Sequence, residues 1–437
     1  MVHSENVSYC LKEWSNLFSS QTKFLFFFLF VGLVSIHAEE ASYGISGNPG
    51  AVNSVTGTGD LGKWLQIPES SGVRLGGMYI GDGNALLTGR QGTGPWTGNS
   101  VLIIDLLIDL QKAIGWEGAY FGSEFLQFNG QSTNADAGVV QGYNSLTGSP
   151  PLNRSELYQL WLFQKFWGET LTIRIGKTIP IAHFNNVSKP VPTYNTAVTI
   201  PSVSALTYTP IFVNTTLLGA IGGYYNSVYG AVATIAPVKE AYVNLGFFDG
   251  SLARGIQTGV KAGPHFNGYY FSIMEVGYSW VNAKPGIAAV GGWYQSGKLV
   301  KGSQTQTGTG GFYAFASQAL WVKPSDSTNK GNISGFLQFG WSNSRTLEMN
   351  LFAGAGLSFF ALIPQRPYDS FGFGLAWSRL NPHLFSRFSE LMVQGYYQLQ
   401  ILSSIYFETS FSYIPNPGAH PDRSNVSAIT SRMTFLF

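Results

Sequence analysis

The end of the chain, residues 429–437, has the sequence Ile-Thr-Ser-Arg-Met-Thr-Phe-Leu-Phe. Side chains two positions apart point to the same side of a β-strand. One side of this segment carries Ile429, Met433, Phe435 and Phe437. The other side carries Thr430, Arg432 and Thr434. The segment therefore predicts a closing strand with one apolar and one polar face, and its last residue is aromatic.

The same alternation recurs through much of the chain. In Val101–Gln111 the even positions are all Leu or Ile, whereas Asp105 and Asp109 share the odd positions with Gln111. A helix would distribute these aspartates around its surface, so we expect a strand. Similar segments are 171–176, 241–247 and 405–412, and turn-forming sequences such as 81–84, 249–251, 323–326 and 415–418 lie between such segments. The pattern indicates many antiparallel strands joined by turns.

The composition decides between two all-β architectures. Charged residues make up only 11% of the chain and aromatic residues 15%, and there are 53 glycines. A soluble β-sandwich keeps charge on its outer surface, whereas a membrane barrel faces lipid with apolar side chains and keeps polar ones inside. The low charge favours an antiparallel transmembrane β-barrel, with Asp105 and Asp109 lining its lumen.

Only one apolar run suggests a membrane helix. Phe24–Val34 follows Lys23 and is too short to cross a bilayer as a helix. It leads to Ala38, a suitable last residue before signal-peptidase cleavage. We therefore interpret residues 1–38 as a signal peptide, which predicts export to a bacterial outer membrane.

The rest of the chain reads as one unit. Residues 39–69 are rich in Gly and Ser and are expected to form a flexible arm or a plug. Residues 70–437 are assigned to the barrel, and about 25 residues per strand and connection would give about 16 strands. The closing strand is of the kind that outer-membrane assembly machinery recognises, so that machinery is an expected partner through Phe437.

Seven further segments are informative together. They are Gly115–Gly118, Leu157–Leu162, Leu171–Gly176, Gly246–Gly250, Gly292–Gly297, Phe312–Trp321 and Phe411–Gly418. In their sequence and their order, over about residue 75 to 437, they resemble the OprB-type carbohydrate-selective porins. The resemblance implies a 16-stranded barrel that conducts small sugars passively and is narrowed by inward-folded loops with charged and aromatic residues. Loops 131–153 and 183–225 are the hardest to match.

Strand parity then selects candidates for the pore constriction. Arg174 is expected to point inward, as are Glu124 and Trp161, and Arg90 lies in a Gly/Thr-rich segment that could fold into the pore. Gln159 and Lys165 share the parity of Trp161 and would line the lumen. A sugar offers hydroxyl groups to charged side chains and C–H faces to aromatic rings. The alternative is that the charges form a paired ladder supporting the wall and that Trp161 faces lipid.

Enzymatic chemistry finds little support in the sequence. The histidines are isolated, so no metal site or cofactor is expected. Asp105 and Asp109 would lie roughly 13 Å apart on a strand, too far for a glycosidase carboxylate pair. The net charge of +2 gives no basic face for nucleic acid. We expect a sugar porin that is not an enzyme. The first alternative is a general porin, and a lesser alternative is a barrel enzyme. The sequence does not predict the oligomeric state.

Overall fold

The computed structural model describes nine ranges of the chain. They are residues 59–89, 96–146, 152–187, 205–222, 226–238, 240–254, 263–280, 284–323 and 331–437. The predicted signal peptide, Arg90 and residues 39–58 lie outside them. Residues 59–69 of the predicted arm form helix α3 (Asp60–Trp64) and begin the 3-10 helix η1 (Glu69–Ser71). The fold below is that of the unit Ser42–Phe437.

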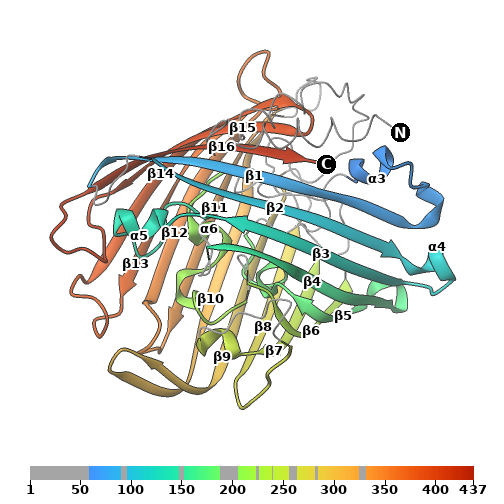
Figure 1. Cartoon of the computed structure of the whole chain (residues 1–437), viewed down its shortest axis with the longest axis horizontal. Coiled ribbons are helices and arrows are strands. Elements are labelled where there is room, and N and C mark those ends of the chain that lie inside the picture. Colours follow the sequence, from blue (N-terminus) through green and yellow to red (C-terminus); the bar gives the residue numbers. More distant parts are fainter. Residues whose placement is uncertain are drawn as a thin grey trace, which may run out of the picture. The chain divides into compact units, whose positions relative to one another are not determined.

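Within the described residues, sixteen strands form one closed antiparallel barrel (Figure 1). The predicted fold class is confirmed. The strands are β1 (Val73–Thr88), β2 (Trp96–Asp109), β3 (Ala119–Asn129), β4 (Asn153–Phe166), β5 (Leu171–Thr178), β6 (Val228–Val238), β7 (Ala241–Asp249), β8 (Tyr270–Trp280), β9 (Gly286–Lys301), β10 (Gln304–Val322), β11 (Asn332–Ser342), β12 (Met349–Phe360), β13 (Ser370–Leu380), β14 (Ser389–Leu402), β15 (Ile405–Ile414) and β16 (Val426–Leu436).

Short helices lie in the connections between these strands. The α-helices are α4 (Leu110–Ile114), α5 (Thr133–Ala137) and α6 (Thr209–Phe212), and the 3-10 helices are η2 (Trp167–Glu169), η3 (Pro180–Ala182), η4 (Thr215–Leu217) and η5 (Ser251–Arg254). In the parts of the chain that the structure describes, we find no helix with the length and apolar character needed to cross a membrane.

The ring closes where β16 pairs with β1. Phe437 extends this pairing, because its carbonyl accepts the N–H of Gly77 at 2.7 Å and its own N–H donates to the Gly77 carbonyl at 2.9 Å. A Cβ atom at Gly77 would lie 2.2 Å from the carbonyl oxygen of Ile103 and 2.8 Å from the Phe437 ring. A side chain at position 77 would therefore displace the terminal aromatic residue from the seam.

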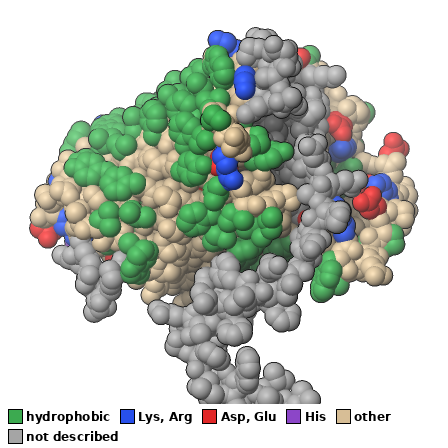
Figure 2. Space-filling model, turned by 90° about the horizontal axis from the view of Figure 1, so that it is seen from above, with side chains coloured by type: hydrophobic (Ala, Val, Ile, Leu, Met, Phe, Trp, Pro, Cys, Tyr) green, Lys and Arg blue, Asp and Glu red, His purple; other side chains and the backbone are tan. Residues whose placement is uncertain are grey.

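The strands have two chemically distinct faces. In β11 the outward side chains of Leu337, Phe339 and Trp341 are exposed, whereas Gln338 between them is buried. Figure 2 shows hydrophobic side chains spread over much of the outer surface, with most charged side chains toward its ends. This is the inversion that distinguishes a membrane barrel from a soluble β-sandwich.

The two ends of the barrel carry different connections. The chain enters β1 and leaves β16 at one end, where strands are joined by short turns such as 167–170 and 403–404. The opposite end carries the longest connections, which are 130–152, 179–227 and 250–269. Outer-membrane barrels have short periplasmic turns and longer extracellular loops. We therefore refer to the short-turn end and the long-loop end.

A turn at the short-turn end is held by an ion pair. Asp369 Oδ2 accepts a hydrogen bond from Arg366 Nε at 2.7 Å, and Asp369 Oδ1 accepts from Arg366 Nη2 at 2.9 Å. The Tyr397 hydroxyl and the Gln400 N–H also donate to this carboxylate. Burial opposes ionisation of Asp369, but the hydrogen bonds outweigh it and hold the pKa below its usual value.

This turn should make the barrel sensitive to acid. A carboxyl group whose pKa is lowered by folding stabilises the protein above its unfolded-state pKa of about 3.9, and this contribution is lost as the pH falls through the folded-state value. We therefore expect Asp369→Asn to unfold at a lower denaturant concentration than the natural protein at neutral pH. The difference should shrink below about pH 4. Equilibrium unfolding in detergent at pH 7 and pH 3 checks this, and a difference that does not change with pH would contradict it.

Candidate functional site

The described parts of two long connections fold back into the barrel. We call the described residues of 130–152 the first inner loop and those of 179–227 the second inner loop; they contain α5 and α6 (Figure 1). The described parts are largely buried, including Tyr143 and Leu146 in the first loop and Tyr208 and Leu217 in the second. Buried apolar side chains in connections of this length indicate packing against an interior surface rather than exposure to water.

Polar side chains of the wall hold both inner loops. In the first loop, the N–H of Gln141 donates to Glu390 of β14 at 2.8 Å. In the second, the N–H of Thr207 donates to Gln394 of β14 at 2.6 Å. Further contacts are Asn144 with Asp82 of β1 at 2.9 Å, Asn185 with Glu275 of β8 at 2.6 Å, and Asn214 with the Phe339 carbonyl of β11 at 2.9 Å. The loops therefore line the inner wall at β1, β8, β11 and β14.

One arc of the wall carries charged groups that these loops do not contact by hydrogen bonds. Asp105 of β2 lies opposite Glu124 of β3, which lies opposite Gln159 of β4. Asp105 and Glu124 are buried, and neither oxygen of Asp105 nor Oε1 of Glu124 has a hydrogen-bond partner among the described residues. Two acidic groups and an amide thus form a row across β2, β3 and β4.

Trp161 and Arg174 lie beside this row. Trp161 pairs with Gly122 of β3 and with Gly176 of β5, and a Cβ atom at Gly122 would lie 2.1 Å from the indole ring. The ring therefore lies over the bare backbone of β3. The Arg174 guanidinium stacks on the ring, 4.0 Å from its centroid. The structure places Glu124, Trp161 and Arg174 on the inward face of adjacent strands.

A β-bulge in β4 changes which of its residues are buried along this arc. The register with β3 shifts between the pairs Glu124 with Gln159 and Phe125 with Leu157, so Tyr158 and Gln159 are both buried although they are consecutive. Gln159 Oε1 accepts from the Thr178 hydroxyl at 3.1 Å and from the Ile179 N–H at 3.3 Å. Strict alternation misses Tyr158, because an inserted residue changes the parity of a strand.

Two predicted lumen residues lie near the short-turn end. β2 ends at Asp109 and not at Gln111, because Asp109 Oδ1 accepts the N–H groups of Gln111 and Lys112 and caps α4. Lys165 forms an ion pair with Glu169 at 2.6 Å. Asp109 and Lys165 therefore each have a local partner near the short-turn end: Asp109 caps a helix, and Lys165 is in an ion pair.

The residues that hold the loops were not among the sequence candidates. Glu275, Glu390 and Gln394 are each fully buried, and they accept main-chain N–H groups from the inner loops. A main-chain donor leaves no side-chain signature, so only the inward parity of these three residues was available as a signal. Among the described residues no group of three His, Cys, Asp or Glu side chains could hold a metal ion.

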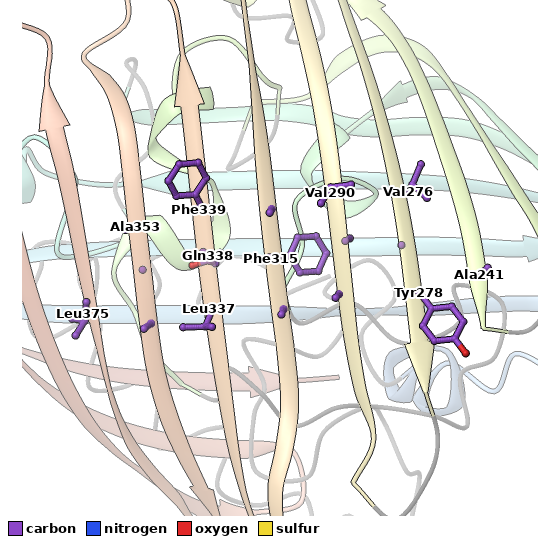
Figure 3. A pocket seen from close by; sticks show the side chains of 17 residues that line it. Ala241, Val276, Tyr278, Val290, Phe315, Leu337, Gln338, Phe339, Ala353 and Leu375 are labelled. Carbon is purple, nitrogen blue, oxygen red and sulfur yellow. The ribbon is translucent and has the colours of Figure 1, made fainter.

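A concavity of about 800 Å³ lies on the other face of the wall (Figure 3). It is lined by residues of β7 to β13, among them the outward-facing Val276, Val290, Leu337 and Leu375. Small residues such as Ala353 also line it. Because this concavity belongs to the outer apolar face, it is not part of the path through the lumen.

A sequence model of the OprB family of carbohydrate-selective porins matches residues 102–437. The chain belongs to this family. Family and fold are those of a channel, and they make the chain an outer-membrane porin for carbohydrates. No curated protein matches it in sequence.

Solved structures share the fold. The high-pH structure of Pseudomonas putida OprB is 18% identical, with a TM-score of 0.73, and the match covers 91% of this chain and 100% of that chain. The low-pH structure of the same protein is 16% identical, with a TM-score of 0.56 and coverages of 88% and 99%. An anion-selective porin from Comamonas acidovorans is 11% identical, with a TM-score of 0.52 and coverages of 84% and 99%.

Proposed function

We propose that small sugars cross the barrel along the arc of β2, β3, β4 and β5, where Glu124, Trp161 and Arg174 form the constriction. The observation that carries this proposal is the pair of inward acidic groups, Asp105 and Glu124, for which no hydrogen bond from the inner loops is found among the described residues. Asp105 extends the row on β2. Elsewhere the loops occupy much of the wall, so a solute would meet this arc.

The groups on this arc complement a neutral sugar. Sugar hydroxyls can donate to the carboxylates of Asp105 and Glu124 and can accept from the Arg174 guanidinium. Trp161 Nε1 has no hydrogen-bond partner among the described residues and can donate as well. Hydrogen bonds that a sugar exchanges for its hydration shell are weak in net terms, which suits passage, because tight binding would slow release.

Ion current through single channels tests this function. Glucose or maltose added to the salt solution should reduce the current more than a polyethylene glycol of similar size, because the glycol lacks the dense hydroxyl pattern. Liposome swelling should show the same preference for sugars. If neither assay distinguishes sugar from glycol, the lumen acts as a size filter and the general-porin alternative holds.

Export and assembly are part of the same proposal. We infer that residues 1–38 direct the chain to the outer membrane and that β16 with Phe437 is the segment recognised by the assembly machinery. The support for the second inference is the position of Phe437 at the seam, where it pairs with Gly77. The outward residues Ile429, Met433 and Phe435 give β16 the apolar face that the sequence predicted.

A further inference from the structure

Glu390 lies at the start of β14, near the long-loop end of the barrel, and its side chain is fully buried. Its carboxylate accepts three main-chain N–H groups. These come from Val140 at 3.0 Å and Gln141 at 2.8 Å in the first inner loop, and from Gly418 at 2.6 Å in the connection 415–425. One wall carboxylate therefore joins two connections that are far apart in sequence.

The third donor requires a glycine. A Cβ atom at Gly418 would lie 2.4 Å from Leu380 Cδ1, 2.9 Å from Val140 Cγ2 and 3.2 Å from Glu390 Oε2. The bare backbone at position 418 thus allows its N–H to reach the carboxylate. Next to it, the Ala419 N–H donates to the Gly138 carbonyl at 3.1 Å, which ties the same two connections together again.

A second set of bonds links this cluster to the second inner loop. Gln141 Nε2 donates to the Glu390 carbonyl at 2.9 Å, and Gln141 Oε1 accepts from the Ser378 hydroxyl of β13 at 2.8 Å. The Ser378 hydroxyl also lies 2.9 Å from the hydroxyl of Thr215 in the second inner loop. The loops are bonded directly to each other as well, from Ser145 N–H to the Thr207 carbonyl at 2.7 Å.

We propose that Glu390 is a positioning residue that sets the cross-section of the pore by holding the first inner loop and the connection 415–425 against β14. Hydrogen bonds to an ionised carboxylate are about twice as strong as neutral ones, and a buried acceptor that satisfies three main-chain donors is costly to replace. Releasing Glu390 would free the first inner loop to move within the lumen. The second inner loop would lose its link through Gln141.

Single-channel recording of Glu390→Gln in salt alone tests this proposal. Glutamine keeps the size of the side chain but removes the charge and one acceptor oxygen. Loss of one hydrogen bond to a charged group should make enlarged and noisy current levels at least about tenfold more frequent. Because no sugar is used, this result is independent of the sugar path proposed above, although it rests on the chain being a pore.

Glu408→Gln is the matched control. Glu408 is a buried, inward glutamate on the neighbouring strand β15, and its Oε1 has no hydrogen-bond partner among the described residues. The control removes the same charge from the lumen and should leave the current levels steady. If both variants behave alike, or if Glu390→Gln conducts as the natural protein does, the proposal is overturned.

Gln141→Leu provides a second, independent variant. It removes the bonds to the Glu390 and Ala376 carbonyls and to Ser378 without touching the barrel wall. We expect a smaller effect in the same direction and a less than additive effect when it is combined with Glu390→Gln. Circular dichroism melting should show folded barrels. If Glu390→Gln does not fold, steady currents in Gln141→Leu would overturn the proposal.

Discussion

Arg174→Ala is expected to weaken the block of ion current by sugar about tenfold, while the barrel unfolds at nearly the same temperature. The guanidinium is the cation beside Glu124, and it stacks on Trp161 at 4.0 Å. Alanine would remove a charged donor for sugar hydroxyls. The lumen would keep Asp105 and Glu124, so the reversal potential in a salt gradient should also shift toward cation selectivity. Titration of the current with glucose or maltose measures the first effect.

Arg154→Ala is the matched control for this prediction. Arg154 lies on β4, is largely buried, and forms an ion pair with Glu156 at 3.1 Å. Because this ion pair engages Arg154, its removal should change sugar block much less than removal of Arg174. Equal effects of the two substitutions, or unchanged block in Arg174→Ala, would assign Arg174 to the paired ladder that supports the wall.

Gly122→Leu probes the same constriction without changing charge. The new side chain would occupy the place of the Trp161 ring and push it into the lumen. We expect a lower single-channel conductance and altered sugar block with the Glu124 and Arg174 charges intact. Unchanged conductance would show that the position of the ring does not define the narrowest part of the pore.

The alternation of side chains was sufficient to predict the barrel. It fixes which residues face lipid, because a strand in a membrane must present an apolar surface at every second position. The closing strand shows this well, since Arg432 is buried inside while Phe435 lies on the outward face. The rule fails where the chain departs from regular pleating. The bulge at Tyr158 and the end of β2 at Asp109 are such places.

The lumen could be predicted only in part. Parity indicates that Glu124, Arg174 and Glu390 point inward, but it does not distinguish a residue on the arc of β2 to β5 from one that holds a loop. That distinction depends on where the loops lie. Val140, Gln141 and Gly418 use their main-chain N–H groups to bind Glu390, and every residue except proline has such a group. The sequence therefore carries no pattern that identifies these contacts.

Arg432→Met is expected to destabilise the barrel strongly, by about 3–5 kcal/mol. Arg432 and Asp82 lie directly opposite each other where β16 meets β1. Arg432 Nε donates to Asp82 Oδ1 at 2.8 Å and Nη2 donates to Oδ2 at 2.7 Å, and both residues are buried. Removing the arginine leaves a buried carboxylate without its cation. Urea unfolding in lipid vesicles, followed by tryptophan fluorescence, measures the loss.

The double substitution Asp82→Asn with Arg432→Met distinguishes the cost of an unpaired buried charge from the cost of losing the contact between β1 and β16. Breaking one partner of a buried pair costs more than replacing both, so the double variant should recover a large part of the lost stability. Lys301→Met is a control from an exposed ion pair with Glu348, and it should change stability by less than about 1 kcal/mol. If Arg432→Met unfolds like this control, the main-chain hydrogen bonds between β1 and β16 suffice to close the barrel, and the ion pair would serve the lumen instead.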